Sequence, residues 1–125
     1  MSDQIAALRW RTAEGDDAPA VSAAIDAWWP GRHIVHMVCP QLFEHFGDTC
    51  LLVEDENRAE GDRLVAFLLG MLSQRMPAAG YIHYAGVRPE YRGTGLGRKM
   101  YETWALRKFF FWLRTLKPFS WRTSS

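Results

Sequence analysis

The sequence has few of the features that mark secreted or membrane proteins. Among its 125 residues it contains only two cysteines, Cys39 and Cys50. This excludes a scaffold of several disulfides and makes a reducing, cytoplasmic setting the expectation. Its longest nearly continuous apolar run, Leu64 to Leu72, is nine residues, whereas a membrane-spanning helix needs about 20. The first residues also lack the basic and apolar blocks of a signal peptide.

Charge of either sign is not in excess. The chain has 15 basic and 14 acidic residues and a formal net charge of +1, so its overall balance does not favour a strongly charged partner. Hydrophobic residues make up 48% and charged residues 23%, which is typical of a globular domain and not of a disordered chain. The length suits a single domain with one core.

Hydrophobic spacing and turn residues divide the chain into a strand, one or two helices, three strands and a final helix. Turn pairs such as Pro30-Gly31 and Gly61-Asp62 separate these elements. In chain order we expect a strand over 5–11, a helix over 19–28, a helical zone over 33–46 interrupted at Pro40, strands over 50–53, 64–72 and 81–87, and a helix from 95 to about 113.

A glycine-rich stretch between the last expected strand and the last expected helix carries the most information. Gly93, Gly95 and Gly97 occupy alternate positions there. Without side chains at these positions, successive backbone N–H groups can point into one concavity at the positive end of the helix dipole. Such a concavity binds anions, and three nearby basic residues add positive charge. The favoured ligand is therefore a phosphate or pyrophosphate.

Two other phosphate-binding patterns do not fit this stretch. The P-loop requires Gly-Lys-Ser/Thr, but Gly97 is followed by Arg-Lys-Met, so nucleotide hydrolysis is not favoured. The dinucleotide fingerprint requires Gly-x-Gly-x-x-Gly within a βαβ unit. Here the spacing is Gly93-x-Gly95-x-Gly97, and the preceding elements do not form such a unit.

The segment Arg92-x-x-Gly95-x-Gly97 resembles the acetyl-CoA pyrophosphate loop of the GNAT superfamily of N-acetyltransferases, whose pattern is Gln/Arg-x-x-Gly-x-Gly/Ala. The residues that lead into it, 86–91, are also similar to that family. The resemblance covers 5–102 in element order and is sharpest over 81–102. It implies an α+β protein with a mixed sheet and a GNAT-like acyl-CoA N-acyltransferase fold. The order is β-α-α-β-β-β-α, without the family's C-terminal strands and fourth helix.

The resemblance also implies acetyl-CoA as co-substrate and direct attack of an amine on its thioester. In that family the fourth strand pairs with the pantetheine arm, and the loop amides hold the pyrophosphate. By position, Val87 supplies a backbone contact to the cofactor, and Arg98 lies beside the phosphates in the first helical turn. The loop amides come from Arg92, Gly93, Thr94, Gly95, Leu96 and Gly97.

The acid and base of such a reaction are less evident in the sequence. His83 is our candidate base because histidine changes its protonation near neutral pH. Two-residue alternation along the strand places it on the same face as Val87, with Tyr84 on the other. A histidine that only packs or forms a hydrogen bond explains the residue equally well. The tyrosine that usually protonates the thiolate lies on a later helix of the family, and no segment here matches that helix.

Two other clusters have plainer explanations. His33, His36 and Cys39 are three residues apart and could share a helix face that binds a metal. A fourth ligand at a suitable spacing is not obvious, so we expect no metal. Trp28 and Trp29 either line an acceptor pocket, as the first helices do in the family, or pack in the core.

The composition changes near residue 103. Residues 103–125 carry five basic and no acidic residues, whereas 1–102 have a net charge of −4. The segment 109–113 is apolar on every side of a helix, although a third helix normally keeps a polar face. We therefore hypothesise that a partial GNAT domain over 1–102 is followed over 103–125 by the end of the third helix and an atypical basic-aromatic tail. A change of the reading frame or of the gene end near residue 103 would account for this tail.

Two classes of function remain. One is an acetyltransferase acting on a small-molecule or peptide amine. The other is a truncated, non-catalytic acyl-CoA-binding remnant or a tail-mediated interaction module. An unpaired fourth strand and an apolar tail recruit partners, so we expect either a homo-oligomer through these surfaces or a tail folded into the cleft. Nucleic acid and membranes are not expected as partners. The residues expected at or near the contact between copies are Trp104, Phe110, Phe111 and Trp112.

Overall fold

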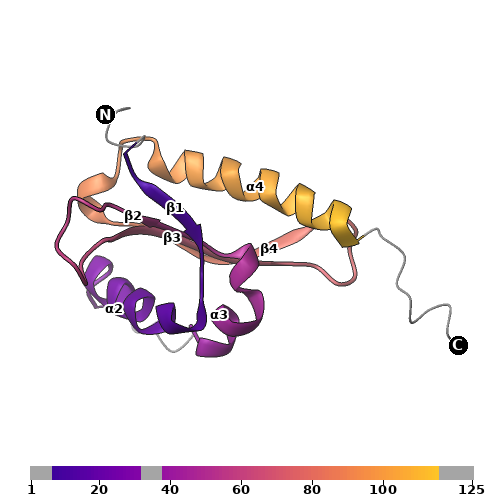
Figure 1. Ribbon diagram of the computed structural model, residues 1–125, viewed down its shortest axis with the longest axis horizontal. Helices are drawn as coiled ribbons and strands as arrows, with labels where there is room; N and C mark the ends of the chain where they lie inside the picture. Colours follow the sequence, from indigo (N-terminus) through magenta and orange to yellow (C-terminus); the bar gives the residue numbers. More distant parts are fainter. Residues whose placement is uncertain (1–6, 32–37, 116–125) are drawn as a thin grey trace, which may run out of the picture.

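The computed structural model describes residues 7–31 and 38–115, with side chains through residue 108 (Figure 1). Its centre is a four-stranded antiparallel sheet in the order β1-β2-β3-β4. Strands that follow one another in the chain are therefore neighbours in the sheet, and β1 and β4 form its two edges. The strands are β1 (Arg9–Thr12), β2 (Leu51–Glu54), β3 (Leu64–Leu72) and β4 (Gly80–Val87).

Helices cover both faces of this sheet. The helices α2 (Ala18–Trp28) and α3 (Pro40–Phe46) lie on one face, and the long helix α4 (Leu96–Thr115) crosses the other (Figure 1). Three short 3-10 segments connect them: η1 (Gly15–Asp17), η3 (Gly47–Thr49) and η4 (Pro89–Tyr91). No helix in the part of the chain that the structure describes is long and apolar enough to cross a membrane.

The element order predicted from the sequence is confirmed. The predicted strand over 64–72 is β3 without change, and the two flanking strands differ by one residue at their ends. Of the helical zone over 33–46, residues 33–37 lie outside the described residues. The described part contains α3, which starts at Pro40 because proline suits a first helical turn. The first strand is four residues long and starts at Arg9.

The apolar sequence of β3 follows from its place between two layers of helices. Phe67 and Leu69 pack with α2 and α3, whereas Ala66 and Leu68 pack beneath α4. A strand that is covered on both faces must be apolar at every position and not only at alternate ones. This is why the run from Leu64 to Leu72 belongs to a sheet and not to a membrane.

A half-buried ion-pair cluster fixes the start of α2 to the sheet. Arg11 on β1 donates hydrogen bonds to the carboxylate of Asp17 at 2.7 and 2.8 Å and to Glu54 at 2.6 Å. Burial alone would raise the pKa of Asp17, but the bond from Arg11 lowers it below its usual value. Asp17 makes no side-chain hydrogen bond as the cap of α2.

Trp104 anchors the middle of α4 to the far end of the sheet. Its indole N–H donates to the carbonyl of Thr49 at 2.6 Å, and its side chain is only 4% exposed. A Cβ at Gly70 or Gly80 would lie 2.7 or 2.5 Å from the ring, so both positions need glycine to admit it. We expected Trp104 at a contact between copies, and this was wrong because the ring is used inside the fold. The side chains of Phe110, Phe111 and Trp112 lie outside the described residues.

We predict that Trp104→Ala lowers the free energy of unfolding by about 3–5 kcal/mol, because it leaves a large cavity and an unpaired Thr49 carbonyl. Leu106→Ala is the control, since Leu106 lies on the same helix but is 60% exposed, and it should change stability by less than about 0.5 kcal/mol. Urea denaturation measures both. Equal stability of the two variants would show that α4 does not depend on this anchor.

Candidate functional site

The outer edge of β4 offers backbone groups that no strand of the described residues pairs with. The amide of Arg88 donates to the carbonyl of Val65 at 2.8 Å, so this antiparallel pair is a hydrogen-bonded one. Hydrogen-bonded and non-hydrogen-bonded pairs alternate, and therefore Ala85 and Val87 direct their N–H and C=O groups away from β3. The register supports this assignment, since Val87 lies opposite Ala66, one position before the Arg88–Val65 pair.

A β-bulge interrupts β4 at His83. Tyr84 lies opposite Leu69, but Ile82 already lies opposite Gly70, so His83 is the extra residue. Beyond the bulge the alternation of side chains changes phase. Ile82 packs on the α4 face together with Ala85 and Val87, which unbroken alternation does not allow.

The bulge corrects our expectation for His83. We placed this side chain on the face of Val87 and opposite Tyr84, but its ring lies 5.1 Å from the ring of Tyr84 in an edge-to-face contact. Tyr84 packs with the α2 and α3 side of the core. The hydroxyl of Tyr81 is 3.3 Å from Nδ1 of His83. His83 thus belongs to an aromatic and polar group on the side of the sheet that α2 and α3 cover.

The glycine loop, residues 92–97, links η4 to the start of α4. Gly93 and Gly95 have positive φ angles of 77° and 87°, a conformation that residues with a Cβ rarely adopt. Nothing lies within 4 Å of the position that a Cβ would take at either glycine. The space in front of the loop is therefore open, and the two glycines are required by the backbone and not by crowding.

The first turn of α4 presents free amides at this loop. The first hydrogen bond within the helix runs from the amide of Lys99 to the carbonyl of Gly95 at 3.0 Å. The amides of Gly97 and Arg98 consequently have no acceptor inside the helix. They lie at its positive end, where an anion is stabilised. A hollow of about 190 Å³ adjoins them, lined by Trp29, Ala85, Gly86, Val87, Arg92, Gly97, Met100 and Tyr101.

The three basic residues near the loop have different surroundings. Arg92 lines the hollow, where its Nε donates to the carbonyl of Val87 at 2.9 Å. Arg98 is exposed and lies 3.8 Å from Glu102. Lys99 lies over the ring of Trp10 on β1, at the opposite edge of the sheet. Of the three, the structure brings only Arg92 to the open edge of β4.

Trp29 joins α2 to this site. Its ring lies against Gly86, where a Cβ would come within 2.3 Å of it, and the guanidinium of Arg92 lies 5.7 Å from the ring centre. Trp28 has the other role that we considered, since it is 6% exposed and stacks on Phe67 in the core. The sequence did not reveal the contact of Trp29 with Arg92, because nothing in their spacing links residues 63 positions apart.

The histidines and cysteines considered as metal ligands are not brought together within the described residues. His33 and His36 lie outside them, Cys39 is exposed, and Cys50 is buried. Burial raises the pKa of the Cys50 thiol to about 11, so it stays protonated at neutral pH and is a poor ligand. Within residues 7–31 and 38–115, no three potential metal ligands lie together.

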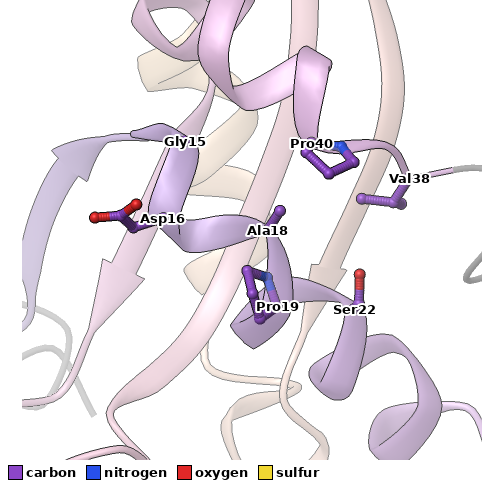
Figure 2. Close-up of a pocket in the computed structure, with 7 residues that line it drawn as sticks. All are labelled: Gly15, Asp16, Ala18, Pro19, Ser22, Val38 and Pro40. Atoms are coloured by element: carbon purple, nitrogen blue, oxygen red, sulfur yellow. The ribbon is translucent and has the colours of Figure 1, made fainter.

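A larger hollow of about 500 Å³ lies between the starts of α2 and α3 (Figure 2). Its walls are mainly apolar, with Pro19, Val38 and Pro40 among them. In Figure 2 the carboxylate of Asp16 points away from Val38 and Pro40, which leaves the hydroxyl of Ser22 as the polar side-chain group near them. This hollow lacks convergent chemical groups and carries no functional assignment.

Comparison with known proteins agrees with the overall fold. The model of the acetyltransferase (GNAT) family matches residues 3–115. Among solved structures, the chain is similar to the diaminobutyrate acetyltransferase EctA from Paenibacillus lautus, determined in complex with L-2,4-diaminobutyric acid and coenzyme A. The sequence identity is 22% and the TM-score 0.59, over 78% of this chain and 55% of that chain. No curated protein sequence matches. The GNAT-like α+β fold implied by the resemblance is confirmed. The expected mixed sheet is corrected, because all pairs among the described strands are antiparallel.

We predict that Gly86→Ala displaces Trp29 and lowers the free energy of unfolding by about 1–3 kcal/mol, because the added methyl group overlaps the indole. Gly97→Ala is the matched control. Its Cβ would lie 3.6 Å from Val87, an ordinary contact, and alanine favours the helix. Urea denaturation with tryptophan fluorescence measures both effects. If Gly86→Ala is as stable as the parent protein, Trp29 does not pack as described.

Proposed function

Because the chain belongs to the acetyltransferase (GNAT) family, we propose that it transfers an acetyl group from acetyl-CoA to an amine. One observation carries this proposal. The open backbone edge of β4 leads directly into a glycine loop whose helix presents free amides. An elongated ligand with a pyrophosphate at one end and an amide-containing arm fits this continuous row of donors and acceptors.

The cofactor is proposed to bind in one direction along β4. Its pyrophosphate lies against the amides of the glycine loop and of Arg98, and its pantetheine arm pairs with the outward backbone of Val87 and Ala85. From Val87 to His83 is four residues, or about 13 Å at the usual rise of a strand. This run brings the thioester end toward the bulge, so the reacting carbonyl lies near His83.

The proposed reaction is a direct transfer. The acceptor nitrogen, once it has lost a proton, attacks the thioester carbonyl carbon. The new C–N bond forms, the C–S bond breaks, and the departing thiolate takes up a proton. His83 is the proposed base, because it lies at the bulge and its Nδ1 is 3.3 Å from the hydroxyl of Tyr81.

The acceptor is proposed to be a small primary amine. The similar structure of EctA contains its substrate L-2,4-diaminobutyric acid, which makes diamino acids and other diamines the first compounds to test. Trp29 is proposed to form one wall of the acceptor side, since it reaches Gly86 and Arg92 from α2. A chain that binds CoA without turnover is the second proposal, because the open edge of β4 and the amides of the loop would bind the cofactor whether or not a base is present.

We predict that Gly95→Val weakens the binding of CoA by more than tenfold, or about 1.4 kcal/mol. The side chain would enter the open space in front of the loop amides. Isothermal titration calorimetry measures the dissociation constant.

Gly61→Val is the matched control for the strain that valine brings at positive φ. Gly61 has a φ of 86°, close to the 87° of Gly95, and equally open surroundings, but it lies between β2 and β3. Both variants should lose similar stability, and only Gly95→Val should lose affinity. Equal affinities for CoA would rule out the glycine loop as the pyrophosphate site.

We predict that His83→Ala lowers kcat by about 100-fold, a typical contribution of a general base, and changes the dissociation constant of CoA by less than about twofold. His45→Ala is the control, since His45 is an exposed histidine on α3. Release of the free CoA thiol with a panel of diamines measures turnover. A pH–rate profile that is the same with and without His83 would contradict its role as base.

A further inference from the structure

Two loops that are far apart in sequence meet beneath the glycine loop. One is the connection between β2 and β3, residues 55–63, and the other is η4 with the residues that follow it. Asp55 and Tyr91 form the buried contact between them, with exposed fractions of 9% and 5%. Tyr91 packs in the core between the sheet and α4, next to Leu96 and Met100.

The bond between Asp55 and Tyr91 is short and has a defined direction. The phenol hydroxyl of Tyr91 donates to Oδ2 of Asp55 at 2.5 Å. This bond lowers the pKa of Asp55, while burial raises the pKa of Tyr91, so the carboxylate stays charged and the phenol keeps its proton. The other oxygen of Asp55 accepts the amide of Asn57 at 3.0 Å. Asp55 is therefore itself fixed by a turn and does not rotate freely.

From Tyr91 the contact continues into the glycine loop. The carbonyl of Tyr91 accepts the hydroxyl of Thr94 at 2.6 Å, and the same hydroxyl oxygen accepts the amide of Leu96 at 3.4 Å. Leu96 is the first residue of α4. A path of hydrogen bonds thus runs from the β2–β3 connection through Tyr91 and Thr94 to the end of the helix that offers its free amides.

A second link runs from Arg88, which directly precedes η4, to the end of the β2–β3 connection. Arg88 donates to the carbonyl of Leu64 at 3.0 Å and to the carboxylate of Asp62 at 2.9 Å. Asp62 is largely exposed, and exposed ion pairs stabilise proteins little. The buried bond of Tyr91 is therefore the stronger of the two constraints, since a hydrogen bond to a charged group away from water is worth more than an exposed one.

We propose that Asp55 and Tyr91 are positioning residues that hold the glycine loop in the conformation that receives the pyrophosphate. The inference rests on the proposed function, because it assigns a purpose to the loop's conformation. Gly93 and Gly95 give the loop its shape but also give the chain many other conformations there. A loop with such freedom binds tightly only when another part of the fold restricts it before the ligand arrives. The buried tyrosine supplies this restriction from outside the loop, without touching the ligand.

The test compares the removal of two hydroxyl groups. Tyr91→Phe removes the bond to Asp55 and leaves the ring in the core. Thr49→Val is the control, because it removes a hydroxyl that donates to the carbonyl of Gly70 at 2.7 Å. Gly70 lies five residues along β3 from Val65, which places this bond roughly 16 Å from the loop end of the strand. Asp55→Asn is a milder variant, since it keeps an oxygen that can accept the phenol hydroxyl.

Three measurements are made on the full chain: the dissociation constant of CoA by calorimetry, thermal unfolding, and hydrogen exchange of the amides over 93–98. We expect both Tyr91→Phe and Thr49→Val to lower the unfolding temperature. Only Tyr91→Phe should speed exchange over 93–98 and weaken CoA, by about five- to tenfold, which is the loss of one such hydrogen bond. Asp55→Asn should give an intermediate result. The change should appear in KM for acetyl-CoA and leave kcat nearly unaltered.

Hydrogen exchange keeps this inference separate from the proposed function. If the parent protein does not bind CoA, the proposed function fails, and exchange over 93–98 still decides whether Tyr91 orders the loop. If the parent protein binds CoA and Tyr91→Phe matches Thr49→Val in both affinity and exchange, Tyr91 only stabilises the fold and the inference is wrong. The same holds if Tyr91→Phe lowers kcat and leaves KM unchanged.

Discussion

The structure depends on keeping one edge of its sheet accessible. The outward backbone of β4 offers the N–H and C=O of Ala85 and the N–H of Val87, whose C=O already accepts a hydrogen bond from Arg92. An exposed row of backbone groups normally pairs with another strand. Here α2 reaches the edge from one face through Trp29, and α4 reaches it from the other through Met100 and Tyr101. The edge thus borders a hollow that side chains from both helical layers line.

Glycine has two distinct purposes in building this arrangement. Gly70, Gly80 and Gly86 are required by close contact, because indole rings occupy the space of a Cβ at each of them. At Gly93 and Gly95 the surroundings are open, and the positive φ angles are the reason for glycine. The first group brings the helices close to the sheet, and the second shapes the loop. A glycine count in the sequence does not separate the two purposes, because only the fold shows which positions face a ring.

The sequence allowed much of the fold to be predicted and less of the site. An apolar run such as Leu64–Leu72 predicts a strand covered on both faces, and the Gly95-x-Gly97 spacing predicts a loop that begins a helix, because both signals are local. The bulge at His83 has no local signal, since it arises from the register between β3 and β4, and it reversed the face that we assigned to this residue. Our expectation for Trp104 was wrong for a similar reason. The glycines that admit its ring, Gly70 and Gly80, lie on β3 and β4, far from it in the sequence.

The hydrogen bond between Asp55 and Tyr91 is also a long-range feature that the sequence does not reveal. It explains how a loop rich in glycine can have one defined conformation. Three glycines within five residues would leave an isolated peptide without a fixed shape. In the folded chain this segment is confined at both ends, by η4 with its buried tyrosine and by α4 with Leu96 and Met100 in the core. The conformation of the loop therefore depends on the buried residues beneath it, and the sequence of the loop alone is not sufficient to fix it.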